Sequence, residues 1–492
     1  MMLVAMALVP LSKALATAQA GAAASWEHCV LPPTRHLNFS EPCAAHSDVA
    51  SYNISWAAQR GEFENAQLLL SARATDGGSG GGELSVQFSD LVSPLGDVIS
   101  SGHLTWRQQG YVMVRHTSRY ADSGCPGLNK DGSCWRPDPL LDPAPNNTIA
   151  MPRDSTHSQP LWITVEVPRN ATPAEQHHEY TGQLTLSLDG TQFAIVNISL
   201  EVWHVSVRTP ADASVQHVWG FSSEHVLPFY PDLPAEQVQT QWWEFMQSHR
   251  LPPMDNAAWM PVPNSSSSSS VPFLADKTGA FESGLASHDC NCSACPPDIA
   301  KRNAKQMKPT IDAAQSVTGA KFFAYGFDER PRSCEKSIRT AFGAFMDEYP
   351  YAQYPWVGGT MGALNWAGGG GNSGPTGSHP SDGGMPLDMP YTAWVLQYQY
   401  YNQTTADVWV NSSYRGRPRE LYLYHCIEPS GVSDLNIFIE RPLIQARLLF
   451  WLGAVQNIQV RCLALGYLRA LCLMILSVRY VGVAVLDHKS LG

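Results

Sequence analysis

The sequence predicts a β-sandwich followed by an α/β half with parallel strands. From about Trp26 to Val207, short runs that alternate apolar and polar residues are separated by turn residues, as in antiparallel sheets with one buried face. After Pro210 the pattern changes to apolar strand-like runs that alternate with helical periodicity, which is typical of parallel βα units. At 492 residues the chain also exceeds the usual size of one hydrophobic core. We therefore expect two domains, of class β and α/β.

Four segments of the first half show the strand alternation most clearly: 66–71, 84–88, 161–167 and 182–188. They predict an antiparallel β-sandwich. The glycine-rich run 77–82 lies between two of these strands. It lacks the Lys-Ser/Thr pair and the following helix of a phosphate-binding loop, so we interpret it as a hairpin tip.

The second half contains helices with one apolar face. Their apolar residues recur at helical spacing: Val238, Trp242, Phe245 and Met246 in one helix, and Ile338, Phe342, Phe345 and Tyr349 in another. Strands are indicated at 215–221, 322–327, 354–361, 391–396 and 421–427, and a further helix at about 441–452. These units make up most, but not all, of an eight-fold (β/α) barrel.

Charge and hydropathy exclude some classes of partner. A net charge of −11 and a pI near 5.8, with no basic stretch, argue against nucleic acid. The apolar segment 460–486 is interrupted by Arg461, Arg469 and Arg479, each of which costs roughly 2.5 to 3.5 kcal/mol at the centre of a membrane helix, so we expect no span. The 15 Trp and 18 Tyr include rings of the kind that stack on sugars, although most large aromatics in any protein are buried.

The N-terminus and the sequons indicate the secretory pathway. Residues 1–20 form an apolar run that ends in Ala18-Gln19-Ala20, the small-residue pattern of a signal-peptide cleavage site. Nine N-x-[ST] sequons agree with secretion or a secretory-pathway lumen, and predict a glycoprotein: Asn38, Asn53, Asn146, Asn170, Asn197, Asn264, Asn291, Asn402 and Asn411.

In an oxidising compartment, most of the 11 cysteines are expected to form disulfides. Cys125 and Cys134 bracket a short loop that a bridge could close, and Cys29 with Cys43 is a second plausible pair. The cluster of three cysteines between positions 290 and 295 could bind zinc, but thiolates in a secreted chain usually oxidise instead. We therefore expect no metal.

The run 321–331, KFFAYGFDERP, ends an apolar strand in two adjacent carboxylates, Asp328 and Glu329. In parallel α/β folds the loops at the carboxyl ends of the strands carry the chemistry, so the pair lies where an active site would be built. Paired acids at such a place suggest glycosidic chemistry. An acid close before Pro331 can also simply cap the following helix, and on the residues alone both interpretations stay open.

Five motifs, spread over about residues 60 to 455, together resemble one known family. They are WRPDPLL at 135–141, SQPLW at 158–162 with Val167-Pro168 after it, YTG at 180–182, YGFDERP at 325–331, and the run 425–451 with its His, Glu-Pro, Asn and Ile-Glu positions. This set is similar to glycoside hydrolase family 123. The resemblance implies a sandwich, a (β/α)8 barrel, and removal of terminal β-linked N-acetylgalactosamine from a glycan or glycolipid.

The resemblance also implies a mechanism for the acid pair. In this family the substrate's own 2-acetamido oxygen attacks the anomeric carbon, so no enzyme nucleophile and no cofactor are needed. The family pattern gives the acid/base role to Glu329, and the orientation of the acetamide to Asp328. Four further residues on or near predicted barrel strands are candidates for substrate binding, although packing is the commoner role for each: Trp219, Asp388, Trp394 and His425.

The resemblance ends where Gln459 leads into Val460, because the aromatic eighth strand of the family is missing there. We therefore expect a barrel that lacks its normal last strand, and a changed reading frame or a faulty gene prediction would explain the departure. The expected domains are a signal peptide at 1–20, a sandwich at 21–208, a catalytic barrel at 212–459 and a non-family tail at 460–492. The alternative function is an impaired, glycan-binding hydrolase-like protein.

Overall fold

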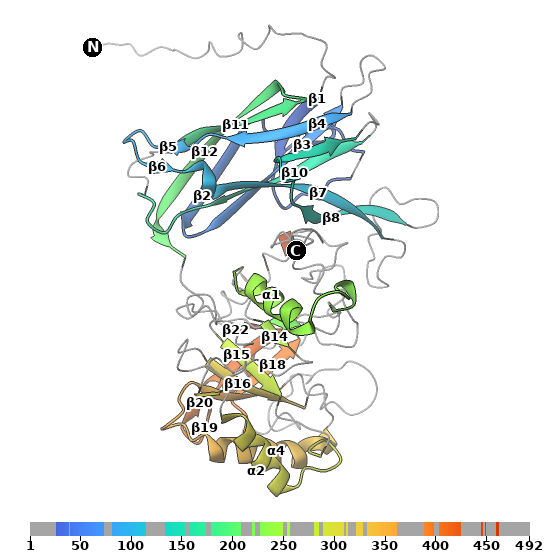
Figure 1. Ribbon diagram of the computed structural model, residues 1–492. Helices are drawn as coiled ribbons and strands as arrows, with labels where there is room; N and C mark the ends of the chain where they lie inside the picture. Colours follow the sequence, from blue (N-terminus) through green and yellow to red (C-terminus); the bar gives the residue numbers. More distant parts are fainter. Residues whose placement is uncertain are drawn as a thin grey trace, which may run out of the picture. The chain divides into compact units, whose positions relative to one another are not determined.

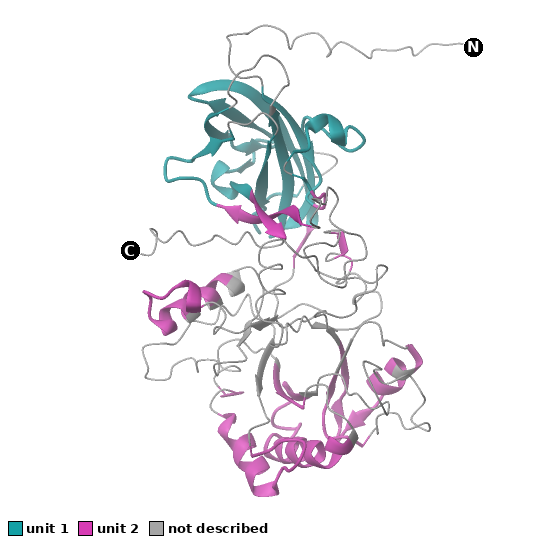
Figure 2. Cartoon of the chain, turned by 90° about the vertical axis from the view of Figure 1, so that its right-hand side faces the viewer, with its two compact units in different colours: residues 1–33, 37–109, 142–204 teal, residues 34–36, 110–141, 205–492 magenta. Residues whose placement is uncertain are grey.

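The computed structural model divides into two compact units (Figures 1 and 2). Unit 1 comprises residues 1–33, 37–109 and 142–204, and unit 2 comprises residues 34–36, 110–141 and 205–492. The structure describes residues 26–38, 40–72, 81–114, 133–152, 157–173, 179–207, 219–221, 227–248, 253–255, 280–284, 289–308, 311–312, 321–327, 332–361, 388–397, 403–424, 444–445, 448 and 459–461.

One sheet of the sandwich has five strands in the order β1-β3-β10-β7-β8. These are β1 (Trp26–Leu31), β3 (Phe63–Ala72), β10 (Ser158–Glu166), β7 (Leu104–Val114) and β8 (Cys134–Leu141). The central strand β10 pairs antiparallel with both β3 and β7. Leu161, Ile163 and Val165 recur at every second position of β10 and each is 0% exposed, which confirms the predicted strand and its core-facing side, although Trp162 between them is also buried, at 9% exposed.

The other sheet has seven strands, five of them in the order β2-β12-β11-β4-β9 and two short ones, β5 and β6, attached beside β11. These are β2 (Ile54–Arg60), β12 (Thr191–Ser206), β11 (Tyr180–Leu188), β4 (Gly82–Phe88), β9 (Thr148–Met151), β5 (Leu91–Val92) and β6 (Val98–Ile99). A hairpin joins β11 to β12 through Asp189 and Gly190, whose φ angles are 49° and 77°. Two consecutive positive φ angles are what a type I′ turn requires, and Asp-Gly is a preferred pair for it.

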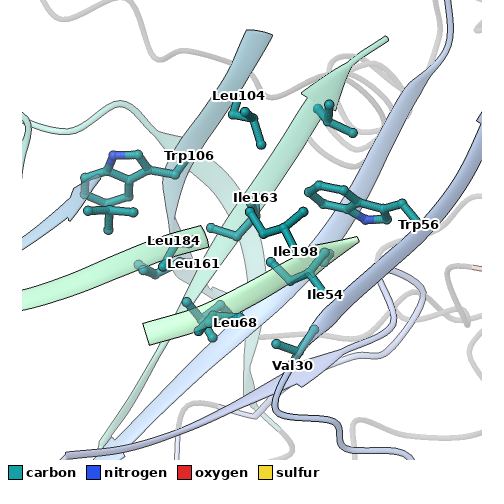
Figure 3. Packing of buried hydrophobic residues seen from close by; sticks show 14 of the residues in the cluster. Val30, Ile54, Trp56, Leu68, Leu104, Trp106, Leu161, Ile163, Leu184 and Ile198 are labelled. Carbon is teal, nitrogen blue, oxygen red and sulfur yellow. The ribbon is translucent and has the colours of Figure 1, made fainter. Parts of the chain in front are cut away.

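The two sheets share one hydrophobic core (Figure 3). Ile54, Leu184 and Ile198 from the seven-stranded sheet meet Leu68 and Leu161 from the five-stranded sheet, and all five are at most 1% exposed. The core is mainly aliphatic, with Trp56 and Trp106 at its margins in Figure 3. Two antiparallel sheets that bury their alternate residues against each other form the predicted β-sandwich architecture.

The second unit is built on parallel strands. Six of them form one sheet in the order β15-β16-β17-β18-β21-β22, and β13 pairs in parallel with β14. Their bounds are β13 (Trp219–Phe221), β14 (Pro253–Asp255), β15 (Ala280–Gly284), β16 (Lys321–Gly326), β17 (Val357–Met361), β18 (Ala393–Gln397), β21 (Glu420–Tyr424) and β22 (Gln459–Arg461). Each predicted strand of this half is therefore present, with its ends shifted by a few residues. A small antiparallel pair, β19 (Ser413–Tyr414) and β20 (Arg417–Pro418), precedes β21.

Helices connect several of these strands: α1 (Ala235–Ser248), α2 (Pro297–Gln306), α4 (Glu335–Glu348) and α5 (Gln403–Val410). The helices α2 and α4 pack against each other, and α5 packs on β21. The predicted apolar face of α4 is confirmed, since Ile338, Phe342 and Phe345 are 0% exposed. Gly359 on β17 leaves room for this face, because a Cβ there would lie 2.7 Å from Cδ1 of Phe342.

The structure differs from the expectation of a missing last strand. Gln459, Val460 and Arg461 form β22, which pairs in parallel with Tyr422 to Tyr424 of β21. A parallel ladder uses only backbone N–H and C=O groups, so the family's aromatic side chains are not required for a strand at this place. The described strands and helices do not by themselves show a closed (β/α)8 barrel. The predicted signal peptide, most of the helix at 441–452 and nearly all of the tail at 460–492 lie outside the described residues.

Candidate active site

The strand that leads to the acid pair is a buried, central strand. Phe322 and Ala324 on β16 are 0% exposed, and β16 lies between β15 and β17 in the parallel sheet. Its last residue, Gly326, pairs with Met361 at the end of β17. The chain therefore leaves β16 at the carboxyl edge of the sheet, where parallel α/β folds place catalytic loops.

Phe327, directly after β16, has a left-handed backbone with φ 57°. Such an angle is rare for a bulky residue and costs on the order of 1 to 3 kcal/mol. The side chain is only 4% exposed and its ring centroid lies 6.3 Å from that of Phe342 on α4. Packing thus holds Phe327 in an unfavourable conformation immediately before Asp328 and Glu329. The two acids themselves lie outside the described residues.

The chain is fixed again soon after the acid pair. A 3₁₀ turn, η6 (Arg332–Cys334), leads into α4, and Cys334 is fully buried and bonded to Cys292 through a disulfide. Only positions 328 to 331 separate buried Phe327 from this turn. Both ends of the acid-bearing segment are therefore anchored, one by aromatic packing and the other by a covalent bond.

Disulfides account for the cysteine cluster. Cys290 is bonded to Cys295, and Cys292 to Cys334, so these sulfurs are not available as thiolate ligands for zinc. The described residues contain no other group of three His, Cys, Asp or Glu side chains placed to hold a metal. The predicted pair Cys29–Cys43 is confirmed. Cys134 is also disulfide-bonded, and its predicted partner Cys125 lies outside the described residues.

Asp388 lies before β18 rather than after a strand. Its Oδ1 accepts a hydrogen bond from the Arg339 guanidinium at 2.8 Å, and the same guanidinium contacts Glu335 Oε1 at 2.7 Å. The bond from Arg339 lowers the pKa of Asp388 below its usual value. The ion pair places Asp388 beside the first turns of α4, the helix that begins six residues after Glu329. This ion pair accounts for the Asp388 carboxylate without a ligand.

Trp394 is part of the core between β18 and α5. It is 3% exposed, and its ring meets Trp409 of α5 edge-on at 5.9 Å. The ring centroid of Trp409 lies 5.4 Å from that of Tyr391. The guanidinium carbon of Arg419 lies over the Trp409 ring, 4.0 Å from its centroid. Sugar stacking needs an open ring face, and the aromatic cluster covers that of Trp394. The function proposed below therefore assigns no role in substrate binding to Trp394 or Asp388.

For the remaining predicted residues, only their positions relative to the strands are known. Trp219 is the first residue of β13. His425 lies outside the described residues, but it follows directly on Tyr424, the last residue of β21. His425 and Asp328 thus both come after the carboxyl ends of strands in one sheet. The left-handed Phe327 and the Cys292–Cys334 bridge were not predicted, and nothing in the local sequence signals the former.

Comparisons with known proteins bear on this arrangement. Residues 38–187 match the family model described as the Glycoside hydrolase 123 N-terminal domain. A family 123 glycoside hydrolase from Clostridium perfringens, described in connection with glycolipid glycan hydrolysis, has a similar structure, with a TM-score of 0.58 and 11% identity over 89% of this chain and 78% of that one. A glycosyl hydrolase family 2 member from Bacteroides cellulosilyticus aligns with a TM-score of 0.29 and 9% identity, over 83% of this chain and 42% of that one. No curated protein matches the sequence.

Residues 38–187, the larger part of the sandwich, thus match the N-terminal domain of glycoside hydrolase family 123. The resemblance stated from the sequence is thereby confirmed, and the shared fold extends over most of the chain. Together these findings support a glycoside hydrolase. None of the described helices has the length and hydropathy needed to span a bilayer.

The motifs that identify the family 123 domain have structural roles. Gln159 in the SQPLW motif is 6% exposed, donates from Nε2 to the Pro160 carbonyl at 2.8 Å, and accepts from Gln108 Nε2 at 2.8 Å. Tyr180 in the YTG motif is 2% exposed and donates its hydroxyl to the Thr172 carbonyl at 3.0 Å. Buried polar groups that are satisfied in this way stabilise one particular packing arrangement. They identify the domain without marking a binding site.

Proposed function

We propose that this chain removes terminal β-linked N-acetylgalactosamine from a glycan or glycolipid, with Glu329 as general acid/base and Asp328 as the residue that orients the 2-acetamido group. The observation that carries the proposal is Phe327, a buried aromatic residue with φ 57° directly before the two acids. Strained backbone of this kind is kept where it serves a site, because relaxation would be favourable otherwise.

The turn at Phe327 also supports two different roles for adjacent acids. Successive residues of a regular strand point to opposite faces of the sheet, so a continued strand would separate the two carboxylates. A left-handed residue ends the strand and redirects the chain at the carboxyl edge. Both acids can then approach one sugar from different directions.

A (β/α)8-type barrel is the scaffold that we propose for this site. Eight parallel strands follow one another along unit 2, in two hydrogen-bonded groups. Neighbouring strands of the sheet are also staggered. Gly326, the last residue of β16, is level with Met361 and Trp394 on the next two strands. Trp394 in turn is level with Leu421, which is only the second residue of β21. Closed barrels require such a progressive shift between neighbouring strands.

The proposed reaction has two steps. The acetamido oxygen attacks the anomeric carbon while Glu329 gives its proton to the departing glycosidic oxygen, which forms a cyclic oxazolinium-like intermediate. Asp328 accepts a hydrogen bond from the acetamide N–H and offsets the positive charge that develops there. In the second step the Glu329 carboxylate takes a proton from water, which attacks the anomeric carbon and restores the acetamide. The configuration of the sugar is retained.

A chromogenic β-N-acetylgalactosaminide tests the proposal. Glu329→Gln should lower kcat by roughly 10² to 10⁴, the usual contribution of a positioned general acid/base. Asp142→Asn serves as the control, because it neutralises an exposed carboxylate of the sandwich that is bonded to Arg107. A β-galactoside, which lacks the acetamide, should not be turned over, and a thiazoline-shaped mimic of the intermediate should bind more tightly than substrate. Equal rates for wild type and Glu329→Gln would refute the acid/base assignment.

We also propose that the enzyme works in a secretory lumen or outside the cell. The disulfides Cys29–Cys43, Cys290–Cys295 and Cys292–Cys334 support this location, because such bonds persist in oxidising compartments.

A further inference from the structure

Two sequons lie side by side on the outer face of the seven-stranded sheet. Asn53 immediately precedes β2, and Asn197 lies on β12, the neighbouring strand (Figure 1). The Nδ2 of Asn197 donates to Oδ1 of Asn53 at 3.2 Å, and the hydroxyls of Ser55 and Ser199 are 3.3 Å apart. Both tripeptides read Asn-Ile-Ser, so their acceptor chemistry is identical and only their surroundings differ.

The surroundings of the two amides are unequal. Asn197 is held from both sides, because its Oδ1 also accepts a hydrogen bond from Nε2 of Gln183 on β11 at 3.3 Å. The Nδ2 of Asn53 donates no hydrogen bond to any described residue, although both amides line the same surface cavity of about 760 Å³. In the described sheet, β2 is an edge strand whereas β12 has a neighbour on each side.

The order of synthesis separates the two sites further. N-glycosylation acts on the chain as it enters the secretory lumen, before the sheet is complete. Asn53 and Asn197 are 144 residues apart, which takes on the order of 10 s at about 5 to 20 residues per second. During that interval the only strand that pairs with β2 in the described sheet does not exist. Asn53 is therefore without its β12 partner for seconds.

Asn197 does not wait for its partner strand, because that strand is synthesised first. Its cross-strand partner Gln183 lies only 14 residues upstream, and the two are joined by the Asp189-Gly190 turn. A hairpin of this kind forms in roughly 1 to 10 μs, far faster than the chain is extended. The hairpin fixes Asn197 in a paired strand as soon as β12 emerges, although its side chain stays exposed, and the already synthesised β2 can then add to it.

We infer that Asn53 carries an N-linked glycan and that Asn197, with the same tripeptide, does not. In the reaction, Nδ2 of Asn53 forms a bond to the anomeric carbon of a lipid-linked oligosaccharide, the bond from that carbon to the lipid diphosphate breaks, and Nδ2 loses one proton. The glycan lies beside the edge strand β2. A bulky, hydrated group there blocks the pairing of this edge with another chain, the hazard that exposed edge strands present.

Expression of the full chain in mammalian cells, followed by peptide mass spectrometry after enzymatic deglycosylation in ¹⁸O water, tests the inference. Asn53 should be converted to labelled Asp, and Asn197 should remain an amide. Ser55→Ala should remove one glycan, and Ser199→Ala should leave the number of glycans unchanged. The two variants are matched, because each loses the same Ser55–Ser199 hydrogen bond. Equal occupancy of the two sites, or an unmodified Asn53, would overturn the inference.

A third variant tests the role of the hairpin. Gly190 has φ 77°, an angle that a β-branched residue adopts only with strain, so Gly190→Val should delay the turn. Occupancy of Asn197, measured on cell-associated chains whether or not they fold, should then rise from near zero. An Asn197 that stays unmodified in this variant would overturn the explanation by hairpin formation.

Discussion

Exposed turns and the buried end of β16 use left-handed backbone in different settings. In the sandwich, Asn147 with φ 60° and Asp189 with φ 49° are exposed turn residues, of types that tolerate this conformation. Arg415 with φ 51° is likewise an exposed turn residue, between β19 and β20 of the parallel unit, whereas Phe327 with φ 57° is buried and follows the end of a central strand. The three turn residues reverse the chain direction between strands. Phe327 belongs to no hairpin, so its strain needs another explanation, and the acid pair beside it supplies one.

The cores of the two units differ in a related way. The sandwich core consists mainly of aliphatic side chains such as Leu68, Ile163 and Leu184, which alternate along regular strands. The core of the parallel unit is rich in rings, with Phe342 5.9 Å from Tyr391. Large rings hold neighbouring backbone in place through extensive contact, which is what a strained segment such as Phe327 requires. Among the described residues, the sandwich core has no such segment to support.

The largest expected effect comes from removing the Phe327 ring. Phe327→Ala should lower the free energy of unfolding by about 3 to 5 kcal/mol, as for other buried Phe residues, and should also lower kcat of the folded fraction, because the acid pair loses its anchor. Leu184→Ala in the sandwich should cost about 2 to 5 kcal/mol without changing kcat. Urea unfolding and kcat at a temperature where both variants are folded provide the measurements.

Phe327→Gly distinguishes the contribution of ring packing from that of backbone strain. Glycine adopts a positive φ without the steric cost, so this variant keeps the turn while losing the packing. If Phe327→Ala loses stability but keeps the wild-type kcat, Phe327 serves packing alone, and the proposed link between strain and catalysis is wrong.

The disulfides give the next comparison. Cys292 and Cys334 are 42 residues apart, and Cys29 and Cys43 are 14 apart. By loop entropy, replacing the longer bridge by two alanines should cost roughly 4 kcal/mol and the shorter one roughly 3 kcal/mol. Only the longer bridge anchors the segment after the acid pair, so only its loss should lower kcat/KM. Thermal unfolding and initial rates of the two double variants check this. An equal loss of activity in both would show that the bridge does not position the acids.

Features with a local periodic signal could be predicted from the sequence. The alternation of Leu161, Ile163 and Val165 predicts β10, and the helical spacing of Ile338, Phe342 and Phe345 predicts the buried face of α4, because burial imposes the period of each element on its side chains. The pair Cys29–Cys43 could be proposed because the two residues are close in sequence.

Features that depend on distant parts of the chain could not be predicted. The φ angle of Phe327 follows from packing against Phe342 on a later helix, and an aromatic residue at that position otherwise reads as one more residue of the strand. The partner of Cys292 lies 42 residues away, so spacing alone left the cysteine cluster ambiguous. The strand β22 escaped prediction because its pairing uses the backbone, whereas the expectation rested on side chains.

The smallest effect concerns one surface ion pair from each unit. Arg339–Asp388 in unit 2 and Arg107–Asp142 in the family 123 domain have N···O distances of 2.8 and 2.7 Å. The Asp388 side chain is 73% exposed, so solvent screens the pair, and Asp388→Asn should cost less than about 1 kcal/mol at neutral pH. Asp142→Asn should cost a similar or slightly larger amount, because Asp142 is less exposed, at 53%, and Arg339 keeps its contact with Glu335 when Asp388 is neutralised.

The pH dependence of the Asp388 effect has a definite sign. Hydrogen bonding from Arg339 lowers the folded-state pKa of Asp388, so its contribution to stability is present above the unfolded pKa of about 3.9 and is lost as the pH falls through the lower folded value. The difference between wild type and Asp388→Asn, measured as the urea midpoint, should therefore be constant from pH 7 to 5 and disappear in more acidic solution. A difference that grows on acidification would mean that Asp388 is stabilised in its protonated form, and the bond to Arg339 would then not account for this carboxylate.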